Sequence, residues 1–165
     1  MSLSKLHPKE IAEICNGYWL NENIPQYAFH HMVIDSRQMA SNTLFIALRG
    51  AHKDGHDFLE SLAEHPEHGA IVKKPNSEIS SPQLVVADVE ASLQALAKFI
   101  AHDSSARKIA ITGSVGKTST KDMLAAMLAV AGSVHATKGN LNNHLGVPLT
   151  LNSMPENTNF LVAEM

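Results

Sequence analysis

The sequence contains a single cysteine, has no excess of positive charge and lacks long apolar runs. Cys15 excludes a disulfide within the chain and fits a reducing compartment. The formal net charge of −3 at pH 7 gives no electrostatic signature of binding to nucleic acid or to an anionic membrane. No apolar stretch approaches the roughly 20 residues that span a bilayer, and no secretory signal opens the chain. With 44% hydrophobic and 18% charged residues, the composition predicts a soluble, cytoplasmic globular protein.

Ten histidines are present, and two of them could form a metal cluster with neighbouring carboxylates. His52 and His56 are four positions apart, with Asp54 and Asp57 beside them. A zinc site usually needs a further ligand pair at a defined spacing, and the sequence shows none. Because Asp-Gly at 54–55 is typical of a turn, we favour solvated loop positions over a metal site for these histidines.

The first hundred residues alternate between apolar runs of strand length and amphipathic stretches of helix length. Strands are predicted at 29–34, 43–48, 70–72 and 84–87. Helices are predicted from Pro8 to a stop at Gly17, around 58–63, and over 91–102. This alternation predicts a small α/β domain over residues 1–103.

The pattern of predicted elements changes after a polar linker at 103–106. A strand at 108–112 leads directly into glycine, a helix from Lys117 is predicted to end at Gly132, and a strand at 159–164 closes the sequence. The stretch 135–157 is predicted to be rich in loops. These features indicate the beginning of a parallel-sheet domain over 107–165. A chain rarely ends inside a central strand, so we expect a piece of a longer protein, inactive by itself.

The strongest chemical signal lies between that strand and that helix, where residues 113–118 read Gly-Ser-Val-Gly-Lys-Thr. Glycines let backbone N–H groups point inward at phosphate oxygens, and a helix N-terminus adds its positive dipole end. Lys117 can neutralise the β- and γ-phosphates, and the Thr118 hydroxyl can bind Mg²⁺. The general pattern requires glycine at position 111, which is Ile111, so this loop is a shortened form; a chance Gly-Lys-Thr in a glycine-rich turn is the alternative. The predicted ATP site comprises Gly113, Ser114, Val115, Gly116, Lys117, Thr118 and Ser119.

The shortened loop at 112–118 resembles the phosphate loop of the Mur ligases, the ATP-dependent amide-bond enzymes of peptidoglycan synthesis. Other blocks, at 35–37, 44–50, 54–58 and 69–70, follow the order seen in the first domain of that family. The segment 138–150 is similar to the segment that is typical of the family members that add D-alanyl-D-alanine. The resemblance implies a small N-terminal α/β domain that binds substrate, followed by the start of a P-loop, parallel-sheet domain that binds ATP.

The resemblance also implies a reaction. ATP would phosphorylate the terminal carboxylate of UDP-N-acetylmuramoyl-tripeptide, and the amine of D-alanyl-D-alanine would attack the acyl phosphate. Lys117 and Glu164 would be catalytic, with Glu164 joining Thr118 as a ligand of Mg²⁺; without the resemblance, Glu164 could equally be a solvated strand end. The implied substrate-binding residues are Asp35, Ser36 and Arg37 near the UDP-sugar, and Asn142, Asn143 and His144 at the cleft; turns are the alternative at both places.

Three other functions compete with this one. They are a family member that adds the third peptide residue, a folylpolyglutamate-type ligase and a non-catalytic nucleotide-binding module. The block 140–143 and the first domain argue against the first two. The joint presence of Lys117, Thr118 and Glu164 argues against the third, because a binder has less need of both metal positions. We expect a monomer with no nucleic-acid partner and no insertion into a membrane.

Overall fold

The computed structural model describes residues 2–50, 53–139 and 144–165. The chain divides into two compact units, Leu3–Leu96 and Ala97–Met165. The division falls within helix α2 (Val89–Asp103), a few residues before the linker expected from the sequence. The functional ranges 1–103 and 107–165 remain predictions. Among the described residues, no helix is long and apolar enough to cross a membrane.

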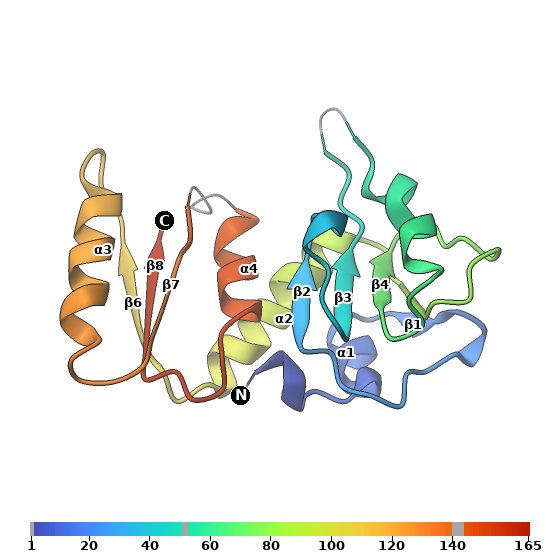
Figure 1. Cartoon of the computed structure of the whole chain (residues 1–165), viewed down its shortest axis with the longest axis horizontal. Coiled ribbons are helices and arrows are strands. Elements are labelled where there is room, and N and C mark those ends of the chain that lie inside the picture. The colour runs from blue at the N-terminus through green and yellow to red at the C-terminus, as the bar shows by residue number, and fades with distance from the viewer. Residues whose placement is uncertain (1, 51–52, 140–143) are drawn as a thin grey trace. The chain divides into compact units, whose positions relative to one another are not determined.

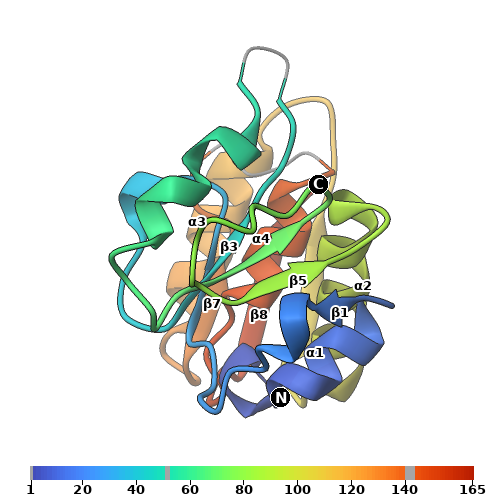
Figure 2. The ribbon, with the colours of Figure 1, turned by 90° about the vertical axis from the view of Figure 1, so that its right-hand side faces the viewer.

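The first unit is built on a five-stranded sheet with the order β1-β5-β4-β3-β2. Four neighbouring strands, β5 to β2, run parallel, and the short β1 pairs antiparallel with β5 at one edge (Figure 2). The presence of these four strands was predicted, without their direction. Strand β1 was missed because two residues carry no periodic signal. The bounds are β1 Tyr18–Trp19, β2 His31–Val33, β3 Thr43–Ile46, β4 Gly69–Val72 and β5 Gln83–Val85.

The helices of this unit are short. In α1 (Pro8–Ile14) the His7 ring accepts from the backbone N–H of Lys9, while Glu10 accepts from that of His7. The helix predicted at 58–63 is instead a 3₁₀-helix, η4 (Gly55–Leu62), whose buried Leu59 and Leu62 are three residues apart, as its threefold period requires. The other 3₁₀ turns are η1 Leu3–Lys5, η2 Leu20–Glu22 and η3 Ser36–Gln38.

The core of the first unit lies on both faces of its sheet. Side chains alternate along β3 and β4, so that Phe45 and Ala70 face one way while Leu44 and Ile71 face the other. All four are fully buried, which is typical of parallel strands covered on both faces. The cluster beneath η4 comprises Phe45, Ala47, Leu59, Leu62, Ala70, Val72 and Val85.

The second unit contains a three-stranded parallel sheet with the order β6-β8-β7, drawn side by side in Figure 1. The predicted parallel pairing of the strands at 108 and 160 is confirmed, since Ile111 of β6 is aligned with Glu164 of β8. The α/β fold class is confirmed in both units. The bounds are β6 Arg107–Ile111, α3 Lys117–Leu128, β7 Val134–Ala136, α4 Gly146–Asn152 and β8 Phe160–Glu164.

Two features of this unit were not expected. The stretch 135–157, predicted to be rich in loops, also holds the end of β7 and all of α4; Pro148 sits in the first turn of α4, where a missing N–H costs no helical bond. Helix α3 therefore leads into β7, not directly into β8. It also ends at Leu128, four residues before Gly132, and it leaves Met123 and Met127 exposed.

Candidate functional site

The glycine-rich loop begins where β6 ends, at the carboxyl edge of the three-stranded sheet, which is where open α/β sheets bind ligands. Gly116 is the N-cap of α3 and adopts a left-handed conformation, φ 76° and ψ 2°. A Cβ at Gly116 would meet nothing within 4 Å, so conformation alone favours glycine here. The first turn of α3 thus presents its N–H groups to the loop. Ser114, Val115 and Ser119 are exposed around it.

Lys117 is the first residue of α3, and its side chain folds back over the loop. The ammonium Nζ donates a hydrogen bond to the carbonyl oxygen of Gly113 at 2.8 Å. Gly113 itself has a φ of 153°, in the region that favours glycine. The Lys117 ammonium and the N–H groups of the first turn of α3 therefore lie at the same loop, and together they supply the groups that bind phosphate.

Thr118 and Glu164 come together from different elements. The Thr118 hydroxyl lies 3.0 Å from Oε2 and 3.2 Å from Oε1 of Glu164 and donates to this carboxylate. The register of β6 and β8 sets this contact, because it aligns Glu164 with Ile111, two residues before the loop. Two hard oxygen donors therefore stand beside Lys117, as a Mg²⁺ site requires.

A second lysine contact of α3 was not predicted from the sequence. Lys121 of α3 is 4% exposed, and its Nζ donates to the carbonyl oxygen of Thr137 at 2.8 Å. The Thr137 hydroxyl accepts the backbone N–H of Glu164 at 3.1 Å. Lys121 also lies 3.1 Å from the carboxylate of Asp122. A chain of contacts thus runs from α3 through Thr137 to Glu164.

The segment 138–150 is only partly described. Asn142 and Asn143, predicted to bind substrate, lie outside the described residues. His144 is exposed and stands two residues before α4. Helix α4 is tied to β7 by His135, whose Nε2 lies 2.9 Å from the carbonyl oxygen of Thr150, and burial lowers the pKa of this histidine.

In the first unit, Asp35, Ser36 and Arg37 follow β2. Asp35 caps η3 by accepting the backbone N–H of Arg37 at 3.1 Å. The Arg37 guanidinium binds both carboxylate oxygens of Asp35, at 2.9 and 2.7 Å, and lowers the pKa of Asp35 to about 2. The Arg37 side chain is 87% exposed, so its remaining donors face solvent.

A cavity of about 300 Å³ opens at the carboxyl ends of β3 and β4. Its cationic residues are Arg49, Lys73 and Lys74, and its acidic residues include Asp54 and Glu90. Such a mixture suits a ligand that carries both phosphate and hydrogen-bonding groups.

His56 lines the same cavity, and the expectation of a solvated position for it was wrong. Its side chain is 16% exposed. Nδ1 lies 2.6 Å from the Asp54 carboxylate, and Nε2 accepts the backbone N–H groups of Lys73 and Lys74 at 3.0 and 3.3 Å. The ring therefore joins the start of η4 to the end of β4, and both its nitrogens have partners. His52 lies outside the described residues.

Comparisons with known proteins match both parts of the chain to the same family. The Mur ligase middle domain matches residues 111–165, and the Mur ligase family catalytic domain matches residues 28–104. The UDP-N-acetylmuramoyl-tripeptide–D-alanyl-D-alanine ligase of Bacillus subtilis is 40% identical over 159 residues, which cover 95% of this chain and 35% of the relative.

Solved structures give the same result. A crystal structure of MurF from Acinetobacter baumannii has a TM-score of 0.89 and 34% identity, covering 100% of this chain and 36% of that one. A MurF from Thermotoga maritima in complex with ADP has a TM-score of 0.71 and 29% identity, covering 82% and 32% of the two chains. The chain therefore spans about a third of the length of these relatives.

Proposed function

The chain belongs to the Mur ligase family, and on this premise we propose that the protein joins D-alanyl-D-alanine to UDP-N-acetylmuramoyl-tripeptide with the hydrolysis of ATP. The reaction is a step of peptidoglycan precursor synthesis and uses cytoplasmic nucleotides. The Bacillus subtilis relative and the Acinetobacter baumannii structure support this branch of the family by their names, identity and coverage of this chain.

The observation that carries the proposal is the meeting of Thr118 and Glu164 beside Lys117. Ligands at 2.0–2.1 Å in an octahedral Mg²⁺ site stand about 2.9 Å apart. The oxygen separations of 3.0 and 3.2 Å between Thr118 and Glu164 are close to this value. Thr118 and Glu164 would hold the ion, which when bound supplies positive charge to the phosphate oxygens of ATP.

The chain's own residues then perform the binding and positioning. The N–H groups of the loop 113–116 and of the first turn of α3 receive the phosphate oxygens of ATP. Lys117 exchanges its bond to the Gly113 carbonyl for the transferring phosphoryl group and stabilises the charge that spreads over it. Buried Glu164 keeps its position through Thr137, so that the loop is preorganised before the nucleotide arrives.

We assign the UDP-sugar end of the substrate to the first unit. Asp35, Ser36 and Arg37 stand at the carboxyl end of β2, on the sheet edge that also bears the cavity with Arg49 and Lys73. An exposed guanidinium can bind a pyrophosphate through two parallel hydrogen bonds. We further propose that Asn142, Asn143 and His144 contact nucleotide or substrate.

We also propose that the 165 residues alone do not complete a turnover. The support is their coverage of about a third of each relative's length. Their share of the work would be the binding of the UDP-sugar and of the ATP phosphates.

The test is ADP release by the complete protein, measured with both proposed substrates and with each one omitted. We expect release only when UDP-N-acetylmuramoyl-tripeptide and D-alanyl-D-alanine are both present. Lys117→Ala should weaken ATP binding by about 2–3 kcal/mol, because it removes a charge-assisted contact, and should reduce turnover further. Lys98→Ala, on the exposed side of α2, is the matched control. Undiminished turnover in Lys117→Ala would sink the assignment.

A further inference from the structure

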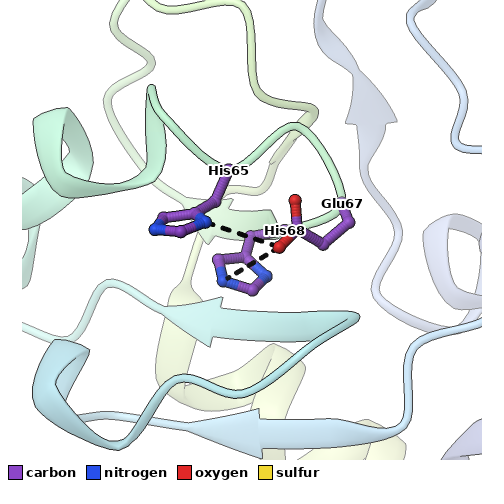
Figure 3. Close-up of side chains that lie close together, drawn as sticks. All are labelled: His65, Glu67 and His68. Atoms are coloured by element: carbon purple, nitrogen blue, oxygen red, sulfur yellow. Dashed lines mark ion pairs between the residues drawn. The ribbon is translucent and has the colours of Figure 1, made fainter.

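A second group of ligand-type side chains lies at the amino end of β4, away from the cavity at the carboxyl ends of the strands. It consists of His65, Glu67 and His68, in the turn between η4 and β4. Their potential ligand atoms lie within 4.8 Å of one another, and the dashed lines in Figure 3 join one nitrogen of each ring to the Glu67 carboxylate. Neither the phosphate loop nor the proposed ligase reaction uses these residues.

The spacing of these atoms suits a small tetrahedral ion. Bonds of 2.0–2.1 Å in a tetrahedral zinc site place neighbouring ligand atoms about 3.4 Å apart. The Nδ1 atom of His65 is 3.4 Å from Oε1 of Glu67, and Nε2 of His68 is 3.9 Å from the same oxygen. Small rotations of the two more exposed side chains, His65 at 53% and Glu67 at 39%, can therefore close the set around an ion.

The turn that carries the ligands is held from three sides. The backbone N–H of His68 donates to the carbonyl oxygen of His65 at 2.9 Å, with Pro66 at the position that favours a turn. The Tyr27 hydroxyl donates to the carbonyl oxygen of Pro66 at 2.7 Å. His68 is only 4% exposed and packs against the His65 ring at a centroid distance of 5.0 Å. One ligand is thus fixed and two can adjust to it.

The hydrogen bond of His68 Nδ1 makes metal binding at Nε2 less favourable. Nδ1 accepts the backbone N–H of Thr43 at 3.4 Å, which is near the upper limit for a hydrogen bond. An ion on Nε2 requires the proton on Nδ1, which would then face the Thr43 N–H as donor against donor. Loading the site therefore breaks this long hydrogen bond and requires the ring and the Thr43 amide to move apart. The affinity should therefore be lower than that of a closed site with four protein ligands.

We propose that His65, Glu67 and His68 bind one divalent transition-metal ion of the zinc class, with a fourth position open to solvent. Two imidazoles and one carboxylate are a donor set that zinc accepts and that Mg²⁺ does not favour. The three residues line a cavity of about 380 Å³ together with Ser36, Met39, Ala40, Ser41 and Ser61, and the fourth position would open into this cavity. Hydroxyl groups there can hold the water that completes the coordination shell.

The experiment is calorimetric titration of the chelator-treated protein with Zn²⁺ alone, repeated with Mg²⁺ alone. We expect one Zn²⁺ per chain at this site and no Mg²⁺ there. His65→Gln, at an exposed position, should weaken zinc binding about tenfold or more. His68→Asn should do the same while its side-chain oxygen still accepts the Thr43 N–H, so that a loss in this variant reflects the missing Nε2. Co²⁺ should give a visible spectrum typical of tetrahedral coordination in the parent and not in either variant.

His102→Gln is the matched control, since His102 is an exposed histidine in α2. Its zinc affinity should equal that of the parent. Zinc affinity unchanged in both His65→Gln and His68→Asn, or no zinc binding by the parent, would overturn the proposal. The ligase reaction can fail its own test without affecting this result, because the readout is binding of the ion.

Discussion

The hydroxyl of Thr118 lies 3.0 Å from Oε2 of Glu164, although 46 residues separate the two in the chain. Because Glu164 closes the strand next to the one that feeds the phosphate loop, the sheet register itself brings the carboxylate to the helix N-terminus. The two side chains that we propose as ligands of Mg²⁺ are therefore in contact through the fold of the chain itself. The consequences of this contact can be measured.

Thr118→Val and Glu164→Gln should each reduce the Mg²⁺-dependent part of ATP affinity. We expect losses of about 1.5–3 kcal/mol, and losses in the double variant that fall well short of the sum, because both side chains would hold one ion. Titrations with ATP at varied Mg²⁺ measure this. Thr120→Val, an exposed threonine of the same helix, is the control. Additive losses would show that the two side chains do not share an ion.

The strand, loop and helix around residues 113–118 were predictable because their signal is local. An apolar strand, two glycines, Gly-Lys-Thr and a helical stripe follow one another in the sequence, and the structure has β6, a left-handed Gly116 and α3 in that order. The meeting of Glu164 with Thr118 is different, since it depends on strand order. No pattern within the sequence predicts that β8 lies between β6 and β7. The role of Glu164 as a metal ligand was inferred only from the family resemblance.

Other features of the structure were not predicted because some residues differ from the usual burial of their residue type. A lysine on a helix is normally solvated, yet Lys121 is buried on a backbone carbonyl. Histidines in a loop were expected to face water, yet His56 joins two elements through both ring nitrogens. The residues 65–68 include three of ligand type within four positions, but the sequence does not show that a turn held by Tyr27 brings their ligand atoms together.

The stability of the first unit should depend on pH through Asp35. Its pKa is about 2 in the folded chain, below the ordinary value of 3.8, chiefly because of the hydrogen bonds from the Arg37 side chain. The unfolded state therefore binds more protons between these two values, and this contribution is present above the ordinary pKa and lost as pH falls toward 2.

Urea unfolding between pH 2 and 5 measures that contribution. Asp35→Asn should flatten the pH dependence because it removes the titrating group. Arg37→Gln should flatten it in part, because it removes the largest cause of the lowered pKa and leaves the backbone hydrogen bond. Since Arg37 is largely exposed, added salt should weaken the effect in the parent. Identical pH profiles for the parent and Asp35→Asn would contradict this account.

Gly69 allows Phe29 to pack at the start of β4. A Cβ at position 69 would lie 2.6 Å from Cζ and 2.9 Å from Cε1 of this fully buried ring. Phe29 cannot retreat freely, because it stacks on Trp19 at 6.1 Å and meets Tyr27 edge-on at 5.5 Å. Gly69→Ala should therefore destabilise the protein by about 1–3 kcal/mol, measured by chemical unfolding. The same change should cost less in a Phe29→Leu background, and an equal cost in both would refute the steric explanation.

Lys121 should act on the nucleotide site without touching the nucleotide. Its Nζ holds the Thr137 carbonyl, and the Thr137 hydroxyl receives the N–H of Glu164. Lys121→Met keeps the apolar stem but leaves the buried carbonyl of Thr137 without this donor, which should cost about 1–3 kcal/mol of unfolding free energy. It should also loosen Glu164 and so raise the Mg²⁺ concentration that half-saturates ATP binding.

Two comparisons separate positioning from general destabilisation. Lys121→Arg retains a donor and should restore much of the Mg²⁺ dependence even where stability is not fully recovered. Gly69→Ala, in the other unit, is the matched destabilised variant and should leave the Mg²⁺ dependence unchanged at temperatures where the protein stays folded. If Lys121→Met lowered stability and left the Mg²⁺ requirement at the parent's value, the lysine would be structural only, and the link from α3 through Thr137 to Glu164 would carry no function.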